Sequence, residues 1–466
     1  MDEQSIKEKA QKHDQEHVLD WLDELEGEKR DNLLRQLSKV NFERVTEMGS
    51  LIGAEHEDID FSSIEPAPVE KLPRNRREEE REEPIIQSGT EALEADRVAC
   101  LTVAGGQGTR LKYDGPKGEF PITPVQGKSL FQVHAEKIRA VRRNFGCTLP
   151  WFIMTSTENH EPTQEFFEEN DYFGLEPETV HFFPQKMQPI LGESGELLRK
   201  GEDELLLGPG GHGRTFHALH DSGALQALED GGWDLLSYFQ VDNPLVPVAD
   251  ERFLGHHIEK NAEFSCKVIP KRDPEEGLGI VVEKDGHPAV IEYIEVPREI
   301  AEQTDSSGQL RFLYGSIAVH MIDVHFVRRM VDEDLHLPWH VAEKEYEVVK
   351  GHGDSRERSL ETCYKFEQFI FEALPHADDC AFVEVAREHE FSPVKNAEGE
   401  DSPRTARRMM TELWADWLEQ AGVDVRNAEG EVKYDLEISP LFARSAAELK
   451  QHLPRNWTPG DPIVLE

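Results

Sequence analysis

The clearest indication of fold in this 466-residue chain is LTVAGGQGTRLKYDGPKGEFP, residues 101–121. It continues an apolar run that begins after Arg97 and ends in glycines, a pattern typical of a buried parallel strand followed by a phosphate-binding loop. Gly105, Gly106 and Gly108 allow the backbone to approach a ligand closely and to present amide N–H groups to it. The segment therefore predicts a strand-to-loop nucleotide site.

Two familiar nucleotide loops do not fit this segment. A dinucleotide fingerprint requires glycine three residues after Gly108, where Leu111 stands, and a P-loop requires GK[ST], where the chain has GTR. What remains is a glycine loop followed by Arg110 and Lys117, two cations in an otherwise acidic chain. Such a pair suits a triphosphate.

The surrounding chain alternates strand and helix patterns. Strands of this kind, separated by helices, predict an α/β domain in which ligands bind beyond the carboxyl ends of the strands. The expected strands are residues 151–156, 180–184, 235–243 and 263–270, and the expected helices include residues 129–146 and 161–170.

The two ends of the chain differ from this central pattern. Residues 1 to about 50 carry two amphipathic helical patterns that hinge near Gly27, and residues 62–84, with three prolines and a mixed charge run, read as an extended linker. A helix and turn-rich segments follow residue 400. We therefore predict an N-terminal helical region and linker (1–95), a catalytic domain (96–400) and a small C-terminal domain (401–466).

Composition narrows the class of protein. The 93 acidic residues against 51 basic ones give a formal charge of -42, which repels nucleic acid and anionic membranes. No apolar run reaches the roughly 18 residues of a membrane helix, and the first residues lack the layout of a signal peptide, so a cytoplasmic protein is expected. The five scattered cysteines predict neither disulfides nor a zinc site.

The strings AGGQGTRL and PKG resemble the hallmark of the UDP-N-acetylhexosamine pyrophosphorylases, within the wider UDP-sugar pyrophosphorylase family. The resemblance implies a Rossmann-like nucleotidyltransferase domain with a mixed, mostly parallel sheet. It assigns base and phosphate binding to Ala104, Gly105, Gly106 and Gln107, and catalytic charge neutralisation to Arg110 and Lys117.

Two further strings extend the resemblance to phosphate and metal binding. EFSPVKNAEGEDSPRTAR, residues 390–407, is similar to a family string whose lysine binds phosphate, which implies a catalytic role for Lys395. VDNPLVPVAD, residues 241–250, places Asp242 after an apolar run, where a carboxylate can hold Mg²⁺, although Asp and Asn also open turns. The resemblance favours Asp242 as the metal ligand and Asn243 as a sugar contact.

Weaker matches nominate the remaining nucleotide contacts. FFPQ implies that Gln185 reads the uracil, and GPGGHG implies nucleotide contacts from Gly211 and His212. The acetylhexosamine enzymes usually carry Asn where His212 stands, whereas the glucose-type enzymes show GHG. His212 with a purely structural hydrogen bond is an open alternative.

The sugar contacts rest on two strings. AVIEYIEV implies that Glu292 reaches the sugar hydroxyls, although strand alternation explains the same spacing. FLYGSIAVH resembles a sugar-binding segment, but Ser316 stands where the family has the asparagine that contacts the sugar.

The resemblance implies an enzyme that converts UTP and a hexosamine 1-phosphate, above all N-acetylglucosamine 1-phosphate, into UDP-sugar and pyrophosphate with Mg²⁺. No Ser or Cys stands in a GxSxG elbow or beside a recognisable base, so direct in-line attack on the α-phosphorus is expected. A UDP-glucose or broad-specificity pyrophosphorylase is the first alternative, and a non-catalytic sugar-nucleotide-binding protein is the second. No nucleic acid or membrane partner is expected, and the oligomeric state stays open.

Overall fold

The computed structural model describes residues 3–54, 59–333, 335–351, 356–455 and 457–466, and the chain divides into two compact units. Unit 1 consists of residues 1–59, 185–214 and 336–372, and unit 2 of residues 60–184, 215–335 and 373–466. Each unit is therefore assembled from three separate stretches of the chain.

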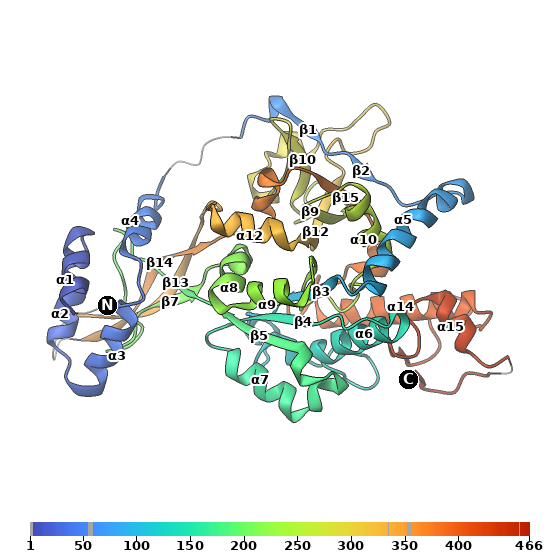
Figure 1. The fold of residues 1–466 in the computed structure, drawn as a ribbon, viewed down its shortest axis with the longest axis horizontal. Helices are drawn as coiled ribbons and strands as arrows, with labels where there is room; N and C mark the ends of the chain where they lie inside the picture. Colours follow the sequence, from blue (N-terminus) through green and yellow to red (C-terminus); the bar gives the residue numbers. More distant parts are fainter. Residues whose placement is uncertain (1–2, 55–58, 334, 352–355, 456) are drawn as a thin grey trace. The chain divides into compact units, whose positions relative to one another are not determined.

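Unit 2 is built on one large twisted sheet (Figure 1). Its main path runs in the order β2-β15-β9-β12-β8-β3-β4-β5, and β1, β10 and β11 extend it beside β12. The strands are β1 (Ile64–Pro66), β2 (Val69–Glu70), β3 (Val98–Val103), β4 (Trp151–Ser156), β5 (Val180–Gln185), β8 (Leu235–Gln240), β9 (Phe264–Pro270), β10 (Ile280–Lys284), β11 (His287–Ile291), β12 (Tyr314–Asp323) and β15 (Cys380–Glu384).

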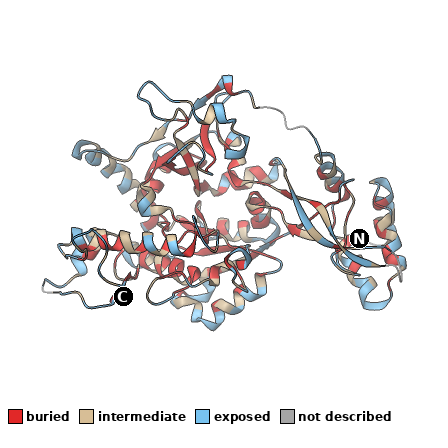
Figure 2. Cartoon of the chain, turned by 180° about the vertical axis from the view of Figure 1, so that it is seen from behind, coloured by how far each residue is buried: buried red, intermediate tan, exposed pale blue. Residues whose placement is uncertain are grey.

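The centre of the sheet is parallel and buried. β3 pairs in parallel with both β4 and β8, and β15 pairs in parallel with β9, whereas β12 runs antiparallel between β8 and β9. β3 and β4 are almost entirely buried, as their continuous apolar sequences require, and Figure 2 shows buried residues concentrated along this sheet. The predicted mixed, mostly parallel α/β fold is confirmed.

Helices cover the sheet and agree closely with the sequence patterns. α6 begins after Ser129, whose hydroxyl accepts a hydrogen bond from the Gln132 N–H, and ends at Gly146 with a φ of 69°. The helices of unit 2 are α5 (Arg76–Glu94), α6 (Leu130–Phe145), α7 (His160–Glu169), α8 (Thr215–Ser222), α9 (Ala224–Gly231), α10 (Glu251–Glu259), α11 (Arg298–Ala301), α12 (Val324–Asp332), α13 (Arg387–Glu390), α14 (Pro403–Gln420) and α15 (Ala446–His452). A short parallel pair, β16 (Leu436–Ile438) and β17 (Ile463–Leu465), lies near the end of the chain.

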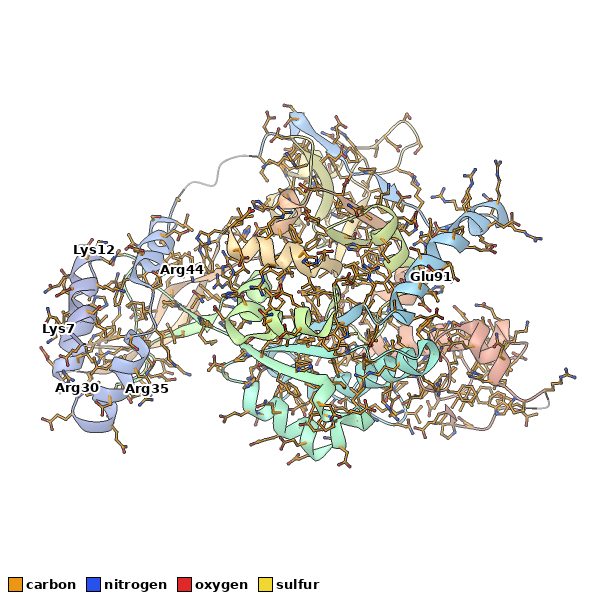
Figure 3. All side chains as sticks on the ribbon, in the orientation of Figure 1. Lys7, Lys12, Arg30, Arg35, Arg44 and Glu91 are labelled. Atoms are coloured by element: carbon orange, nitrogen blue, oxygen red, sulfur yellow. The ribbon has the colours of Figure 1, made fainter. Side chains whose placement is uncertain are left out.

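The predicted extended segment over residues 62–84 agrees with the structure as far as Asn75 and is wrong from Arg76, where a helix begins. The segment forms β1 and β2 and then enters the 19-residue helix α5, which carries Pro84 in its interior. Its N-cap is Asn75, whose side chain accepts from the Glu78 N–H, and close packing on α10 at Gly89 and Gly255 holds it in place. A charge run that looks solvated in sequence is therefore the exposed face of a packed helix (Figure 3, Glu91).

Unit 1 contains the four N-terminal helices and a long hairpin. Its core joins the apolar faces of those helices to residues from 191–205 and 366. Gln15 links the two parts, since its Nε2 donates to the Gly195 carbonyl and its Oε1 accepts from the Leu197 N–H. The elements are α1 (Glu3–Lys12), α2 (His17–Asp23), α3 (Gly27–Leu37), α4 (Phe42–Ser50), β6 (Met187–Pro189), β7 (Leu207–Pro209), β13 (His340–Lys350) and β14 (Glu357–Glu367).

The two units do not coincide with the predicted divisions at residues 95 and 400. Residues 60–95 and 401–466 both belong to unit 2, and two internal insertions complete the N-terminal unit. Among the described residues, no helix is long and apolar enough to cross a membrane.

Candidate active site

The carboxyl ends of the central parallel strands of unit 2 carry the predicted site. β3 runs into the glycine loop and its neighbour β8 runs into Asp242, with Val103 paired to Gln240 at the end of the ladder. Parallel strands end at the same edge of a sheet, and α/β folds place ligands there. The sheet therefore brings the glycine loop and the candidate metal ligand together.

The glycine loop is folded back on itself by its own backbone. The Gly108 N–H donates to the Gly115 carbonyl at 2.8 Å, and the Lys117 N–H donates to the Gly106 carbonyl at 3.0 Å. A Cβ at Gly108 would lie 2.9 Å from Tyr113, whereas a Cβ at Gly106 would meet no atom within 4 Å. Gly108 is thus required by packing, and Gly106 borders open space where a ligand can approach.

Lys117 and Asp242 form the central ion pair of the site. Lys117 Nζ lies 3.0 Å from Asp242 Oδ2, and the two side chains are only 17% and 9% exposed. Gly118 fixes the turn that carries Lys117, because a Cβ there would lie 2.2 Å from the Phe131 ring. A cation and a carboxylate are therefore held side by side next to the glycine loop.

Lys395 reaches the same place from a distant part of the chain. The Val394 N–H donates to the Asp242 carbonyl at 2.9 Å, which fixes the backbone next to Lys395 against the end of β8. Asn243 ties the two segments, since its Nδ2 donates to the Glu390 carbonyl at 2.7 Å and its Oδ1 accepts from the Ser392 N–H at 3.1 Å. Both ends of the Asn243 amide are thus engaged in the fold.

Asp401 is a charged member of this cluster that the sequence reasoning did not nominate. Burial raises the pKa of its carboxyl, Lys395 opposes that rise, and the negative charge of Asp242 adds to it. Its carbonyl also accepts from the Lys395 N–H at 2.7 Å. Asp401 opens the DSPRTAR string that follows the lysine motif, so the signal was present in the sequence.

Asn159 is a second residue that the sequence reasoning missed. Its side chain is fully buried, its Oδ1 accepts from the Ser156 N–H at 2.7 Å, and its Nδ2 donates to the Ala104 carbonyl at 2.8 Å. It therefore connects the end of β4 to the start of the glycine loop. No motif marks it, because an Asn just after a strand usually opens a turn.

Arg110 lies on the 3₁₀ turn Gly108–Leu111 and is exposed. No described carboxylate forms an ion pair with it, in contrast to Lys117. Its charge is available to an anionic ligand.

Glu292 and Ser316 meet around Gly279. The Ser316 N–H donates to the Gly279 carbonyl at 2.9 Å, and a Cβ on Gly279 would lie 3.6 Å from Glu292 Oε1. Glu292 also caps the short turn Tyr293–Glu295. The two predicted sugar contacts are thus neighbours. Glu292 directly follows β11, and Ser316 lies on the irregular part of β12 near Ala318, whose φ is 56°.

Gln185, Gly211 and His212 belong to unit 1 and are described within it. Gln185 is 4% exposed, and its Oε1 is buried without a hydrogen-bond partner among the described residues, so it can accept from a ligand donor. Gly211 has a φ of 83° and packs on the Gln368 backbone, where a Cβ would lie 2.5 Å from the carbonyl oxygen.

His212 has a defined structural environment. Its Nδ1 accepts from the Ile370 N–H at 3.2 Å, its ring stacks on Phe369, and burial lowers its pKa to about 4. The neutral imidazole therefore carries its proton on Nε2. This arrangement supports the alternative that His212 makes a structural hydrogen bond through Nδ1. Its donor group is Nε2–H.

The described residues contain no group of three or more His, Cys, Asp or Glu side chains that could hold a metal by themselves. Mg²⁺ does not need such a cage, since it is commonly bound by one or two carboxylates together with substrate phosphates. Asp242, largely buried beside the glycine loop, fits that mode.

The mixed, mostly parallel α/β sheet, with a glycine loop at the carboxyl ends of its central strands, is the architecture of an α/β nucleotidyltransferase class, and the family comparison agrees. The profile of the family described as UTP--glucose-1-phosphate uridylyltransferase matches residues 40–406, and the chain belongs to this family.

Relatives and solved structures refine the comparison. The chain is 33% identical to UDP-N-acetylglucosamine diphosphorylase 2 of Arabidopsis thaliana (96% of this chain, 91% of the relative) and 34% identical to UDP-N-acetylglucosamine pyrophosphorylase of Saccharomyces cerevisiae (79% of each). The structure of the uridine diphosphate N-acetylglucosamine pyrophosphorylase of Trypanosoma brucei superposes with a TM-score of 0.84 at 29% identity, covering 98% of this chain and 97% of the other.

Proposed function

We propose that this chain transfers the uridylyl group of UTP to N-acetylglucosamine 1-phosphate, releasing pyrophosphate and forming a UDP-sugar. The observation that carries the proposal is the buried Lys117–Asp242 pair beside the glycine loop, with Lys395 fixed next to it. Relatives that span nearly the whole chain are named as UDP-N-acetylglucosamine diphosphorylases or pyrophosphorylases, which supports the acetylated sugar.

The reaction joins two anions and needs no protein nucleophile. An oxygen of the sugar phosphate attacks the α-phosphorus of UTP, and the bond from that phosphorus to the β-phosphate oxygen breaks as pyrophosphate leaves. In this proposal Arg110 and Lys117 face the triphosphate and Lys395 faces the sugar phosphate. These fixed cations would stabilise the negative charge that develops on the phosphate oxygens during the transfer. The backbone N–H groups of the glycine loop bind the nucleotide.

Asp242 is proposed to hold Mg²⁺ when nucleotide is bound. The ion would neutralise phosphate charge and orient the triphosphate. With the carboxylate of Asp242 holding the ion, Lys117, which lies 3.0 Å from it, would present its ammonium group to the phosphates.

Pyrophosphate release from purified protein tests the proposal. With UTP and Mg²⁺, N-acetylglucosamine 1-phosphate should give release that depends on both substrates. Silence with N-acetylglucosamine, N-acetylgalactosamine and glucose 1-phosphates at low and high salt would instead favour a non-catalytic sugar-nucleotide-binding protein.

A glucose-type or broad specificity is the second candidate. Ser316, without an amide, stands where the acetylhexosamine enzymes are expected to carry an asparagine, and His212 follows the glucose-type pattern. A kcat/KM for glucose 1-phosphate above that for N-acetylglucosamine 1-phosphate would select this candidate.

A further inference from the structure

A cavity of about 410 Å³ lies inside unit 2, and no residue of the glycine loop lines it. Its walls come from α6, from the loop that follows Asp242, from α14, and from the segment around residues 437–448. Figure 1 shows α6, α14 and α15 gathered in this region, and Asn144 on α6 donates to Glu448 on α15 at 2.8 Å. The volume falls in the range of pockets that hold small molecules.

One wall of the cavity is apolar and includes aromatic side chains. Met410, Leu413, Trp414 and Trp417 project from successive turns of α14 and line the space together with Leu245. Such a wall can hold the hydrocarbon or ring portion of a ligand.

Most of the charged groups that line the cavity are paired with each other or with a neighbour. Glu136 pairs with Lys128, Glu251 and Glu448 pair with Arg444, and Asp250 and Glu390 pair with the fully buried Lys267. The Glu437 carboxylate accepts from the N–H groups of Val125 and Gln126 through Oε2.

Lys137 is different. Its Nζ donates to the carbonyl oxygens of Pro244 at 2.5 Å and Val246 at 2.7 Å, and no carboxylate of the described residues forms an ion pair with it. An ammonium group has three donors, so one remains for a ligand in the cavity that Lys137 lines. Burial lowers the pKa of this amine to about 7, with the negative charge of Glu390 opposing the shift and the positive charge of Lys267 adding to it.

We propose that this cavity binds an amphipathic organic anion, whose acidic group pairs with Lys137 and whose apolar body packs against α14, and that its occupancy slows catalysis. The link to catalysis is direct in the chain, because Lys137 fastens Pro244 and Val246, which follow Asp242 by two and four residues. A ligand anion that accepts from the third donor attracts the ammonium group, weakens its hydrogen bonds to those two carbonyls and loosens the loop. This second part rests on the proposed function, whereas the binding itself does not.

Three indole compounds of similar size separate the charge requirement from the apolar one. Indole-3-acetate carries an anion, indole-3-acetamide is its neutral counterpart, and tryptamine carries a cation. In calorimetric titrations of the full-length protein, we expect saturable millimolar or tighter binding of indole-3-acetate and at least tenfold weaker binding of the other two. Absence of indole-3-acetate binding, or tighter binding of tryptamine, would overturn the proposal.

Variants locate the site. Lys137→Met should reduce indole-3-acetate affinity at least tenfold, whereas Lys450→Met, at an exposed lysine of α15, should leave it unchanged. Ala443→Phe tests the same site in a different way, because the larger side chain fills the cavity. The test therefore still stands if one of the two variants fails to fold. Unchanged affinity in a folded Lys137→Met or Ala443→Phe protein would contradict the assignment.

The effect of the ligand on catalysis is measured in a separate assay of the reaction rate. Indole-3-acetate should lower kcat with little change in the KM for UTP, and Ala443→Phe should remove that inhibition. Binding without any change of rate would overturn the regulatory part, while an enzyme inactive before any indole is added would count against the proposed function and leave the calorimetric result standing.

Discussion

Lys117 Nζ lies 3.0 Å from Asp242 Oδ2 in a setting where the two side chains are 17% and 9% exposed. The pair joins the turn after β3 to the end of β8, so the two charged groups that we propose act in the reaction hold each other in place in the structure. A partly buried pair of this kind is costly to break on one side only. Both partners therefore matter for structure as well as for the proposed chemistry.

Lys117→Gln should lower kcat by about 10²-fold or more, because a preorganised charge near the transferred phosphate is removed. Steady-state pyrophosphate release measures the effect. Lys112→Gln is the matched control, since Lys112 lies in the same loop with its side chain 77% exposed and should change kcat less than threefold. A loss under threefold for Lys117→Gln would refute its assigned role.

Asp242→Asn should raise the Mg²⁺ concentration that gives half-maximal activity by about tenfold or more, a loss that even indirect partners of metal sites produce. Metal titration of the rate after removal of bound ions by a chelator measures it. Asp424→Asn, at a side chain that is 83% exposed, serves as the control. An unchanged Mg²⁺ requirement in Asp242→Asn would remove Asp242 from the metal site.

Asn159→Asp should raise the KM for UTP about fivefold or more while kcat changes less, because the lost Nδ2 donor leaves the Ala104 carbonyl unpaired and the glycine loop less ordered. An unpaired buried group costs about 1–3 kcal/mol. The variant keeps an acceptor for the Ser156 N–H, and on the loop side it replaces the donor by a carboxylate oxygen that faces the Ala104 carbonyl. Asn170→Asp is the control, since that amide donates to its own helix at Phe166 on an exposed face. Equal KM values in wild type and Asn159→Asp would show that the loop does not depend on this donor.

Two buried histidines should make the fold sensitive to acid. Burial lowers the pKa of His134 and of His257 to about 3. Each ring has one nitrogen without a hydrogen-bond partner among the described residues, Nδ1 in His134 and Nε2 in His257. The folded state holds both rings neutral, whereas the unfolded chain protonates them below a pKa of about 6.5. The free energy of unfolding is therefore greatest above about pH 6.5 and decreases as the pH falls from there toward 3. At pH 5.5 each histidine should cost about 1.4 kcal/mol relative to neutral pH.

The urea midpoint of unfolding at pH 7.5 and pH 5.5 measures this loss. His257→Asn should show a smaller decrease in the midpoint than wild type, and His287→Asn, at an exposed position, should show the same decrease as wild type. A pH dependence unaltered by His257→Asn would contradict the prediction.

Ser316→Asn should shift selectivity toward the acetylated sugar. An added amide that bonds the ligand is worth about 0.5–1.5 kcal/mol, or about twofold to tenfold in the ratio of kcat/KM for N-acetylglucosamine 1-phosphate to that for glucose 1-phosphate. Parallel assays with the two sugar phosphates give the ratio. A ratio that falls or stays constant would contradict the prediction that residue 316 contacts the acetyl group of the sugar.

Local patterns were sufficient for the central sheet and its helices. The predicted strand at residues 151–156 is β4 to the residue, and α6 lies within one residue of its predicted range at both ends, because a buried parallel strand and a Ser-capped, Gly-terminated helix are encoded in adjacent residues. The AGGQGTRL string and the segment after β8 meet because parallel neighbours end together.

Features that depend on distant packing could not be predicted in this way. The predicted linker over residues 62–84 includes the charge run that begins α5, yet α5 is fixed by glycine contacts with α10, which no local pattern reveals. The assembly of unit 1 from three stretches, the hydrogen bonds of Asn159 and the lone ammonium of Lys137 likewise depend on residues far apart in the chain. The sequence carried Asp401 in a motif string, but its coupling to Asp242 required coordinates.

The most direct test of the central claim is pyrophosphate release by the purified protein with UTP, Mg²⁺ and N-acetylglucosamine 1-phosphate, compared with the Lys117→Gln protein. We predict turnover that requires all three components and falls about 10²-fold in the variant. Absence of release with any of the three sugar phosphates, or equal release from both proteins, would contradict the account.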